Sequence, residues 1–448
     1  MQSFASEYNR LKKIENWVKK IYSHLGVNKK QELIRLLYEI SKREDLVPNR
    51  LLIKLPLADF HSLKRILLQR RYPNSFLSKE IRRVYLPKIK ISKNSVFDLE
   101  RYEFSPRKIV IEEAVADSTL SKRFQQAFPK AKQKIIPSLK EYLKKLRCHK
   151  INDYNRRKET IFIVKERFDF FKSCPCTKNA LGCGYHIFNL GFGCIFECTY
   201  CFLQEYTNSP GIILPANLDG FFSAFGSYQF DGMRLGSGEF SDSLMLDEIT
   251  EYSLELIDFF RGYPKVKFEF KTKSKNIENL LKARHQGNIV VGWTLSPDKV
   301  IAENEFFSAK LNQRLEAAKI CSQAGYKISC HLDPVLYFPG WQKEYSRLIE
   351  LIFSNVKTKD IAWVSIGTLR FNAGLKPIIE QRFPANRILD AELIYGFDNK
   401  LRYPFNIRKE LYTFLLKLFF SKAKNIPIYL CMEELRMWQE VGIKKRAL

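Results

Sequence analysis

Three of the ten cysteines of this chain stand in the stretch GFGCIFECTYCF (residues 191–202), where Cys194, Cys198 and Cys201 have the spacing C-x3-C-x2-C. Structural zinc usually takes four ligands, commonly from two C-x2-C pairs, and the sequence contains no second pair with that spacing. A redox-active C-x2-C pair would leave Cys194 without a role. Three thiolates can instead hold three irons of a [4Fe–4S] cluster and leave the fourth iron open to a small molecule. The absent fourth thiol is therefore the feature that points to function.

The stretch YHIFNL (185–190) predicts a strand directly before these cysteines. The thiols would then follow the carboxyl end of a strand, which is where barrel enzymes build their active sites. Residues 425–442 predict a final strand followed by a helix. Strands that alternate with helices over this length indicate a parallel α/β sheet or barrel. Further strands are predicted at 107–114, 160–165, 266–272, 288–295, 326–332 and 361–367, and helices at 274–286 and 312–325.

Residues 1–103 are basic and are predicted to be mainly helical. In KKQELIRLLYEISKRE (29–44), four apolar residues recur at helical spacing and form one stripe: Leu33, Leu36, Leu37 and Ile40. We therefore divide the chain into a basic helical region (1–103), an α/β part (104–172), and a main α/β region that ends in a strand and a helix (173–448).

The chain carries 75 Lys and Arg against 48 Asp and Glu, a formal net charge of +27. This excess favours a polyanionic partner, nucleic acid or an anionic surface, and a solubility effect is the alternative. No run of about 18 apolar residues is present, and the start MQSFASEYNRLKK lacks the apolar core of a secretion signal. We expect a soluble, cytoplasmic protein without a membrane span.

With Tyr200 before its last cysteine, the motif resembles that of the radical S-adenosylmethionine (SAM) superfamily. In that superfamily the open iron chelates the amino and carboxylate groups of SAM, and one-electron reduction releases a 5′-deoxyadenosyl radical. Six longer stretches are similar to the spore photoproduct lyase family, and the likeness runs from about residue 104 to 442. These stretches are residues 175–219, GSGEFSDSLMLD (236–247), 270–287, HLDPVLYFPGW (331–341), SIGTLRF (365–371) and IYLCMEELRMWQ (428–439).

This resemblance implies a partial (β/α)6 barrel that carries one [4Fe–4S] cluster and binds SAM. The named member of the family repairs a methylene-bridged thymine dimer in DNA by hydrogen abstraction and radical C–C bond cleavage. DNA is accordingly the expected partner, with an electron donor such as flavodoxin or ferredoxin. Two alternatives stay open: a radical SAM enzyme that acts on RNA, a peptide or a metabolite, and a non-enzymatic Fe–S protein that binds nucleic acid.

By position, the resemblance makes Cys194, Cys198 and Cys201 the cluster ligands. It makes Tyr200 the aromatic residue beside the cluster and Lys273 a lysine that contacts the cofactor. We expect Tyr200 to belong to the catalytic centre as well.

A glycine-rich stretch in many members of the superfamily lies against the amino group of the SAM methionine. Glycine lets the backbone approach the ligand, and a carboxylate or carbonyl accepts from an ammonium group. Thr294 and Ser296 end a predicted strand, where they would face the cofactor, and ordinary strand-end polarity is the alternative. The residues that correspond to the glycine-rich stretch are Gly236, Ser237, Gly238 and Glu239.

Two positions depart from the pattern of the lyases. A cysteine that returns a hydrogen atom to the product radical corresponds here to Glu239, and a tyrosine of the same relay corresponds to Phe202. A carboxylate O–H bond is too strong to donate a hydrogen atom readily, and phenylalanine has no O–H group. We therefore expect radical generation to be kept while the quenching step differs. Cys330 is a candidate replacement donor, although a free cysteine is more often a small buried apolar residue.

Three further cysteines precede the motif, as Cys174, Cys176 and Cys183. They could ligate a second metal, but their spacing matches no auxiliary-cluster pattern. Asp333, which is followed by Pro334, is expected to end a strand at the mouth of the barrel.

Overall fold

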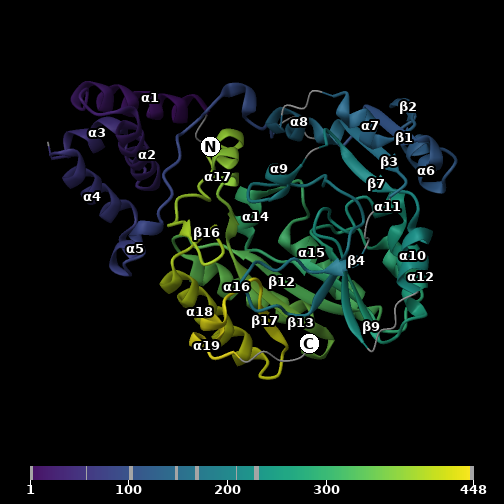
Figure 1. The fold of residues 1–448 in the computed structure, drawn as a ribbon. Helices are drawn as coiled ribbons and strands as arrows, with labels where there is room; N and C mark the ends of the chain where they lie inside the picture. Colours follow the sequence, from purple (N-terminus) through teal and green to yellow (C-terminus); the bar gives the residue numbers. More distant parts are fainter. Residues whose placement is uncertain are drawn as a thin grey trace.

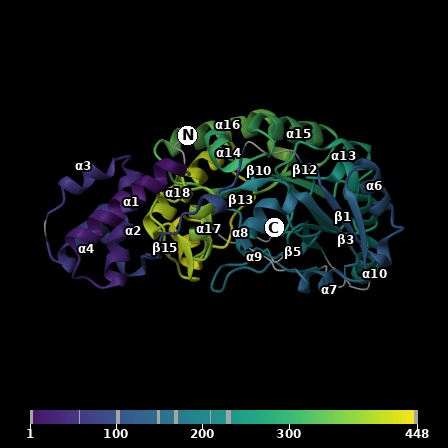
Figure 2. The same cartoon turned by 90° about the horizontal axis from the view of Figure 1, so that it is seen from above.

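The computed structural model describes residues 4–56, 58–99, 104–146, 150–166, 171–207, 209–226 and 232–443 (Figure 1). The N-terminal helices lie at one end of an elongated molecule, a small parallel sheet lies at the other, and a larger curled sheet lies between them (Figures 1 and 2). Within these described ranges, no helix is both long enough and apolar enough to cross a membrane.

The N-terminal helices bury a hydrophobic core of their own. The predicted stripe of Leu33, Leu36, Leu37 and Ile40 is fully buried in it, so that prediction is confirmed. Two of the helices begin with proline, a residue that suits the first helical position because it has no N–H to leave unpaired. The helices are α1 (Phe4–Ile21), α2 (Val27–Arg43), α3 (Pro48–Ile53), α4 (Phe60–Arg71) and α5 (Pro73–Leu77).

The larger sheet has the strand order β17-β13-β12-β10-β9-β8-β5-β4 and is parallel except for the β4–β5 pair. It curls into a half-barrel (Figure 1). Every residue of β10 is buried, because helices cover one face of the sheet and inward side chains fill the other. The strands are β4 (Phe171–Ser173), β5 (Tyr185–Phe188), β8 (Met233–Ser237), β9 (Val266–Thr272), β10 (Ile289–Thr294), β12 (Lys327–Val335), β13 (Ile361–Thr368) and β17 (Ile428–Leu430).

Helices connect successive strands of the half-barrel, as the alternating pattern predicts. The predicted helix at 274–286 is shorter than expected, because only Glu278–Lys282 is helical. The helices are α11 (Asp247–Thr250), α12 (Tyr252–Arg261), α13 (Glu278–Lys282), α14 (Asp298–Asn304), α15 (Leu311–Gln323), α16 (Trp341–Asn355), α17 (Leu375–Arg382), α18 (Phe405–Lys422) and α19 (Leu435–Glu440).

The small sheet has the order β2-β1-β3-β7 and is entirely parallel. Its fourth strand, β7, follows the cysteine motif in the chain, so residues 104–172 do not complete this sheet by themselves. The strands are β1 (Lys108–Glu112), β2 (Lys132–Ile136), β3 (Thr160–Val164) and β7 (Ile212–Pro215), and the nearby helices are α6 (Thr119–Ala127), α7 (Leu139–Lys144), α8 (Lys150–Arg156), α9 (Leu203–Tyr206) and α10 (Leu218–Gly226).

Helix α17 joins the N-terminal helices to the rest of the molecule. Arg35 on α2 pairs with Glu380, and Lys376 pairs with Glu39 at 2.8 Å. All four side chains are almost completely buried. A buried ion pair is costly to break because it leaves an unpaired charge, so these contacts fix the position of the helical region.

Candidate active site

The three cysteines of the motif lie beyond the carboxyl end of β5, as expected. We call residues 194–201 the cluster loop. Part of it forms a short strand, β6 (Glu197–Cys198), which pairs antiparallel with β11 (Glu305–Phe306). Asn304 holds the next residue of the loop, since its carbonyl accepts from the Thr199 N–H at 3.0 Å. The loop is therefore fixed against the segment that follows β10 and α14.

Burial raises the pKa of Cys194 to about 12 and also raises the pKa values of Cys198 and Cys201. Thiolates in such a place need added positive charge, which a bound metal supplies. The loop supplies three thiols, one fewer than the four ligands that structural zinc usually takes and the number needed for three irons of a [4Fe–4S] cluster. The donor set therefore fits an iron–sulfur cluster with one open iron better than a structural zinc ion.

A network of buried ion pairs holds the cluster loop in place. Glu197 accepts from Arg157 at 2.9 Å and from Arg382 at 2.8 Å. Arg157 also donates to the carbonyls of Cys194 and Phe196, at 3.2 and 2.8 Å. The two arginines hold the pKa of Glu197 at about 2, against burial, which would raise it. The loop backbone is thus held in shape by charged groups within the protein.

Gln204 on α9 makes a second set of contacts with the cluster loop. The Nε2 atom of Gln204 donates to the carbonyls of Cys198, Thr199 and Cys201, at 3.2, 2.9 and 3.1 Å. Its Oε1 atom accepts from Arg382. One buried amide therefore holds three backbone carbonyls of the cluster loop.

Several of the predicted site residues lie around the carboxylate of Glu305. Its Oε1 atom accepts from the hydroxyls of Tyr200 and Ser296, and its Oε2 atom lies 2.7 Å from Arg314. The Nζ atom of Lys273 lies 5.8 Å from the centre of the Tyr200 ring. Burial opposes the charge on Lys273, but the Cys198 thiol and Glu305 raise its pKa overall. A cation thus stands beside a cluster ligand.

Asp242 links the glycine-rich stretch to the end of β9. It accepts from the Thr272 hydroxyl and from the Lys273 N–H, each at 2.6 Å, and from the Leu244 N–H at 3.1 Å. Burial raises its pKa. This carboxylate fixes the backbone from which the Lys273 side chain extends.

The glycine-rich stretch begins inside β8 and leaves it at Ser237. A Cβ atom on Gly236 would lie 1.6 Å from the Tyr185 hydroxyl, so no larger residue fits there. Gly238 has φ +94°, a conformation that glycine adopts without strain. The Ser237 hydroxyl is occupied by Ser243 at 2.6 Å and by the Glu269 carbonyl at 3.1 Å. Tyr185 therefore covers Gly236, which is buried, whereas Gly238 is partly exposed and leaves backbone open to an approaching ligand.

The remaining predicted residues separate into two groups. Ser296 joins the Glu305 group, while Thr294 is buried at the end of β10 and its carbonyl accepts from Arg314 at 2.8 Å. Cys330 lies in the main hydrophobic core, and burial raises its pKa to about 12. Its neighbours on β12 take part in polar contacts on the other face of the strand, so the structure does not bring Cys330 to the polar site.

The interior of the half-barrel contains polar groups that the sequence pattern did not reveal. Glu269 lies 2.7 Å from His331 and also accepts from Tyr185 and Ser329. Nearer the carboxyl ends of the strands, Asp333 pairs with Arg370 at 2.8 Å. Arg370 holds the pKa of Asp333 at about 2, against the effect of burial. The expected position of Asp333 towards the mouth agrees with its place near the end of β12.

The family model of spore photoproduct lyase matches residues 104–395, which is more than half of the chain. This chain belongs to the spore photoproduct lyase family. The family is part of the radical SAM superfamily and uses SAM and an iron–sulfur cluster, so the chain is a lyase-like radical SAM enzyme. The resemblance that the sequence motifs indicated is confirmed.

Two curated relatives carry the same name. Spore photoproduct lyase of Geobacillus sp. (strain Y412MC61) is 26% identical over 243 residues, which are 52% of this chain and 69% of the relative. That of Bacillus subtilis (strain 168) is 27% identical over 252 residues, 54% of this chain and 71% of the relative.

Solved structures of spore photoproduct lyase share the fold. A variant with bound AdoMet and dinucleoside spore photoproduct superimposes with a TM-score of 0.62 at 23% identity, over 72% of this chain and 98% of the other. A complex of the lyase with dinucleoside spore photoproduct gives the same TM-score over 73% of this chain. The predicted barrel of the radical SAM type, preceded by a helical region, is confirmed by this likeness together with the strand order.

The two departures from the spore photoproduct lyase pattern lie near each other. Phe202 is 36% exposed, and its ring centre is 6.1 Å from that of Phe240, the residue after Glu239. Glu239 forms an ion pair with Lys172 at 2.9 Å. The structure thus places a charged pair at Glu239 and an apolar ring at Phe202, the two positions at which the sequence resemblance implies a thiol and a phenol in the lyases.

Proposed function

We propose that this protein generates a 5′-deoxyadenosyl radical from SAM and uses it on a DNA lesion of the thymine photoproduct class or a related one. Cys194, Cys198 and Cys201 would hold the [4Fe–4S] cluster that supplies the electron. The observation that carries the proposal is the position of Tyr200, Lys273 and Glu305 beside these thiols, at the carboxyl end of the half-barrel. The cluster itself would be reduced by an electron donor such as flavodoxin or ferredoxin.

The residues near the loop have distinct parts in this proposal. Lys273 would bind the carboxylate of SAM, because it is a buried cation close to Cys198. The backbone at Gly238 would receive the methionine amino group, with the Glu239 carboxylate at its edge, while Gly236 lets the strand pack against Tyr185. Ser296 and Tyr200 would keep Glu305 in place through their hydroxyl groups. Thr294 supports this arrangement through its carbonyl contact with Arg314.

A surface hollow of about 680 Å³ supports a nucleic-acid substrate. Its charged lining residues are three cations, Arg43, Lys299 and Arg387, and two carboxylates, Glu303 and Asp390, of which Asp390 pairs with Arg387 at 2.6 Å. Lys299 would suit a phosphate, and the partly exposed rings of Tyr337 and Phe338 would suit unpaired bases. Asn304 also lines the hollow, and it is the residue that holds the cluster loop.

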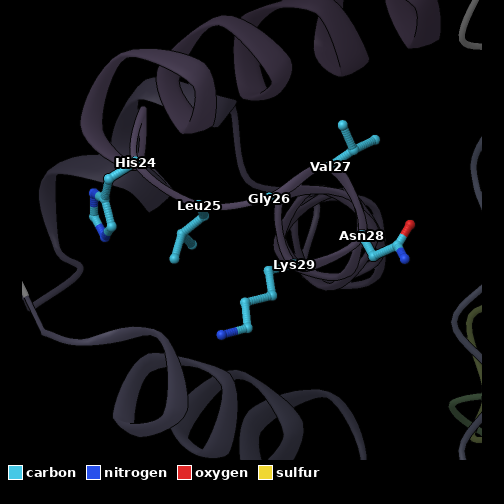
Figure 3. A pocket seen from close by; sticks show the side chains of 6 residues that line it. All are labelled: His24, Leu25, Gly26, Val27, Asn28 and Lys29. Atoms are coloured by element: carbon cyan, nitrogen blue, oxygen red, sulfur yellow. The ribbon is translucent and has the colours of Figure 1, made fainter.

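Another hollow lies at the turn between α1 and α2, lined by residues 24–29 (Figure 3). Its lining contains one lysine and no aromatic side chain other than His24. It belongs to the N-terminal helices and not to the cluster loop. We therefore base no part of the proposal on it.

The proposal is tested by anaerobic reconstitution of the full chain with iron and sulfide, followed by dithionite and SAM. We expect 5′-deoxyadenosine, and more of it when ultraviolet-irradiated DNA is present. Absence of 5′-deoxyadenosine from cluster-loaded protein would contradict radical generation. Formation that no nucleic acid changes would contradict a nucleic-acid substrate.

A different substrate is the second candidate. The replacement of the thiol and phenol by Glu239 and Phe202 favours it, because photoproduct repair needs a hydrogen atom returned to the product radical. RNA, a peptide or a metabolite would then be the target of the same radical, and the formal charge of +27 favours RNA among these. The same assay with RNA in place of irradiated DNA separates the two candidates. Since the family consists of enzymes, a non-enzymatic binding protein is not retained.

A further inference from the structure

Four cysteines outside the cluster loop come together from two distant parts of the sequence. Three belong to the loop between β4 and β5, and the fourth, Cys431, directly follows β17. The two segments pair in an antiparallel manner: Ala180 bridges to Glu434, and the Leu181 N–H donates to the Glu433 carbonyl at 2.8 Å. The ladder ends at this pair, because Met432 has φ +54° and turns the chain, but Cys183 lies close enough to Cys431 to raise its pKa.

The other two thiols are held at the start of the same loop. The N–H of Cys174 donates to the Tyr185 carbonyl at 2.8 Å, so Cys174 lies across the hairpin from a residue close to Cys183. The N–H of Cys176 donates to the carbonyl of Cys174 at 2.7 Å, which turns the chain tightly at Pro175. A hydrogen bond between the two thiols raises the pKa of Cys174 and lowers that of Cys176 to about 6.

Positive charges surround this group of thiols. Arg370 donates to the Cys431 sulfur at 3.3 Å and, together with Lys400, lowers the pKa of Cys176. Arg234 lies near Cys183 and Lys271 near Cys431, but burial raises the pKa values of both thiols, that of Cys431 to about 12. The cations partly offset burial, and a bound metal would supply the rest of the positive charge that these thiols need to bind as thiolates.

The number and arrangement of the thiols indicate which metal group they suit. Each of the other three thiols raises the pKa of Cys174, so all four lie near one another, although the described His, Cys, Asp and Glu side chains form no ready site for a single metal ion. An iron–sulfur cube takes one cysteine at each iron, so its four ligands surround a larger volume than the ligands of zinc. We propose that Cys174, Cys176, Cys183 and Cys431 bind a second iron–sulfur cluster. With four protein ligands it has no open iron, so it would not bind SAM.

The test uses the full chain with Cys194, Cys198 and Cys201 all changed to Ala, reconstituted with iron and sulfide without oxygen. We expect this variant to keep about half of the iron and sulfide of the wild type, because one of two cubes remains. Adding Cys183→Ala and Cys431→Ala should remove the rest. A matched control, Cys321→Ala with Cys330→Ala in the hydrophobic core, should keep the wild-type iron content.

The triple variant would overturn the proposal if it kept its fold, by circular dichroism, and bound no iron. Zinc in place of iron, or disulfides among the four thiols, would also overturn it. If the triple variant does not fold, the wild type still gives an answer: about eight irons per chain support two cubes, and about four contradict them. A negative result for the second cluster would not contradict the proposed first cluster and its SAM chemistry, because the two sites share no ligand.

Discussion

Arg382 at the end of α17 and Glu197 of the cluster loop form an ion pair with 2.8 Å between Nη2 and Oε1, and both side chains are fully buried. The same helix carries Lys376, which pairs with Glu39 of the N-terminal helices. Helix α17 therefore contacts the cluster loop at one end and the basic helical region near the other. One helix therefore holds both the cluster loop and the N-terminal helices, which are far apart in the sequence.

Replacing Arg382 with Met should destabilise the protein by about 3–5 kcal/mol, because it leaves the Glu197 carboxylate buried with one partner fewer. We also expect the variant to retain less iron after reconstitution. Urea unfolding and iron analysis measure the two effects. Arg261→Met is the control: its pair with Asp258 is exposed, so it should cost about 0–1 kcal/mol. Equal unfolding midpoints for the two variants would contradict the support role.

The Glu197 network should also give the protein a defined acid sensitivity. The folded protein holds the pKa of this carboxyl at about 2, whereas the unfolded chain has a value of about 4.3. A lowered folded-state pKa contributes stability that is complete above the unfolded value and is lost as the pH falls towards 2. The difference in unfolding free energy between wild type and Glu197→Gln should therefore be largest above pH ~5 and shrink towards pH ~2. A difference that is constant with pH would contradict this.

Tyr200→Phe should separate cluster binding from cofactor cleavage. The change removes the hydrogen bond from the hydroxyl to Glu305 but keeps the ring near Lys273. We expect an unchanged iron content and a rate of 5′-deoxyadenosine formation lowered by about tenfold, the equivalent of about 1.4 kcal/mol. Tyr206→Phe, on the exposed side of α9, is the control and should change neither quantity. Loss of iron in Tyr200→Phe would show that the residue supports the loop instead.

A double variant, Glu239→Cys with Phe202→Tyr, tests the altered quenching step. It restores a thiol and a phenol, whose S–H and O–H groups can return a hydrogen atom. We expect it to convert dinucleoside spore photoproduct into two thymidines in the presence of SAM and dithionite, at a rate well above that of the wild type. Glu239→Ser with the same tyrosine is the matched control, because a serine O–H bond is too strong to serve as a hydrogen donor. No thymidine from a double variant that still cleaves SAM would mean that the lesion is not a substrate.

The sequence predicted the structure best where a local pattern of residues determines the element. Apolar, β-branched runs predicted β9, β10, β12 and β13, and three thiols in one short loop predicted the cluster site. Strand β8 was missed because MRLGS contains an arginine and a glycine and little β-branched character. The helix expected at 274–286 shortens because the Ser274 side chain accepts from Asn276 N–H and forms a turn there.

The residues that hold the cluster loop in place could not be predicted from the sequence, because they are far from it in the chain. Glu305, Arg314 and Arg382 have no spacing in common with the cysteine motif and meet it only through tertiary packing. Ser329 and Cys330 are neighbours on β12 and lie on opposite faces of the strand, but alternation alone does not say which face meets the polar interior. Contacts with Glu269 on β9 decide that, and they depend on the order of strands in the sheet.

The proposed nucleic-acid substrate gives a quantitative prediction for the basic helical region. Part of the positive charge of this region is used internally, as in the buried pairs of Arg35 and Arg71 with Glu39. The segment that leads from the helices to the barrel keeps Lys88, Lys90 and Lys93 exposed. Each lysine that contacts a phosphate adds about 0.9 to the slope of log affinity against log salt for duplex DNA.

Changing these three lysines to Ala should therefore weaken DNA binding and reduce the salt slope by up to about 2.7, with little effect on unfolding. Fluorescence anisotropy with a labelled duplex, repeated across salt concentrations, measures both quantities. The control variant removes the same amount of charge elsewhere on the molecule, by changing Lys265, Lys267 and Lys357 to Ala. These lysines lie at the start of β9 and before β13 and are also exposed. If the control lowers the slope as much as the first variant, binding follows net charge alone and the helical region has no specific part in it.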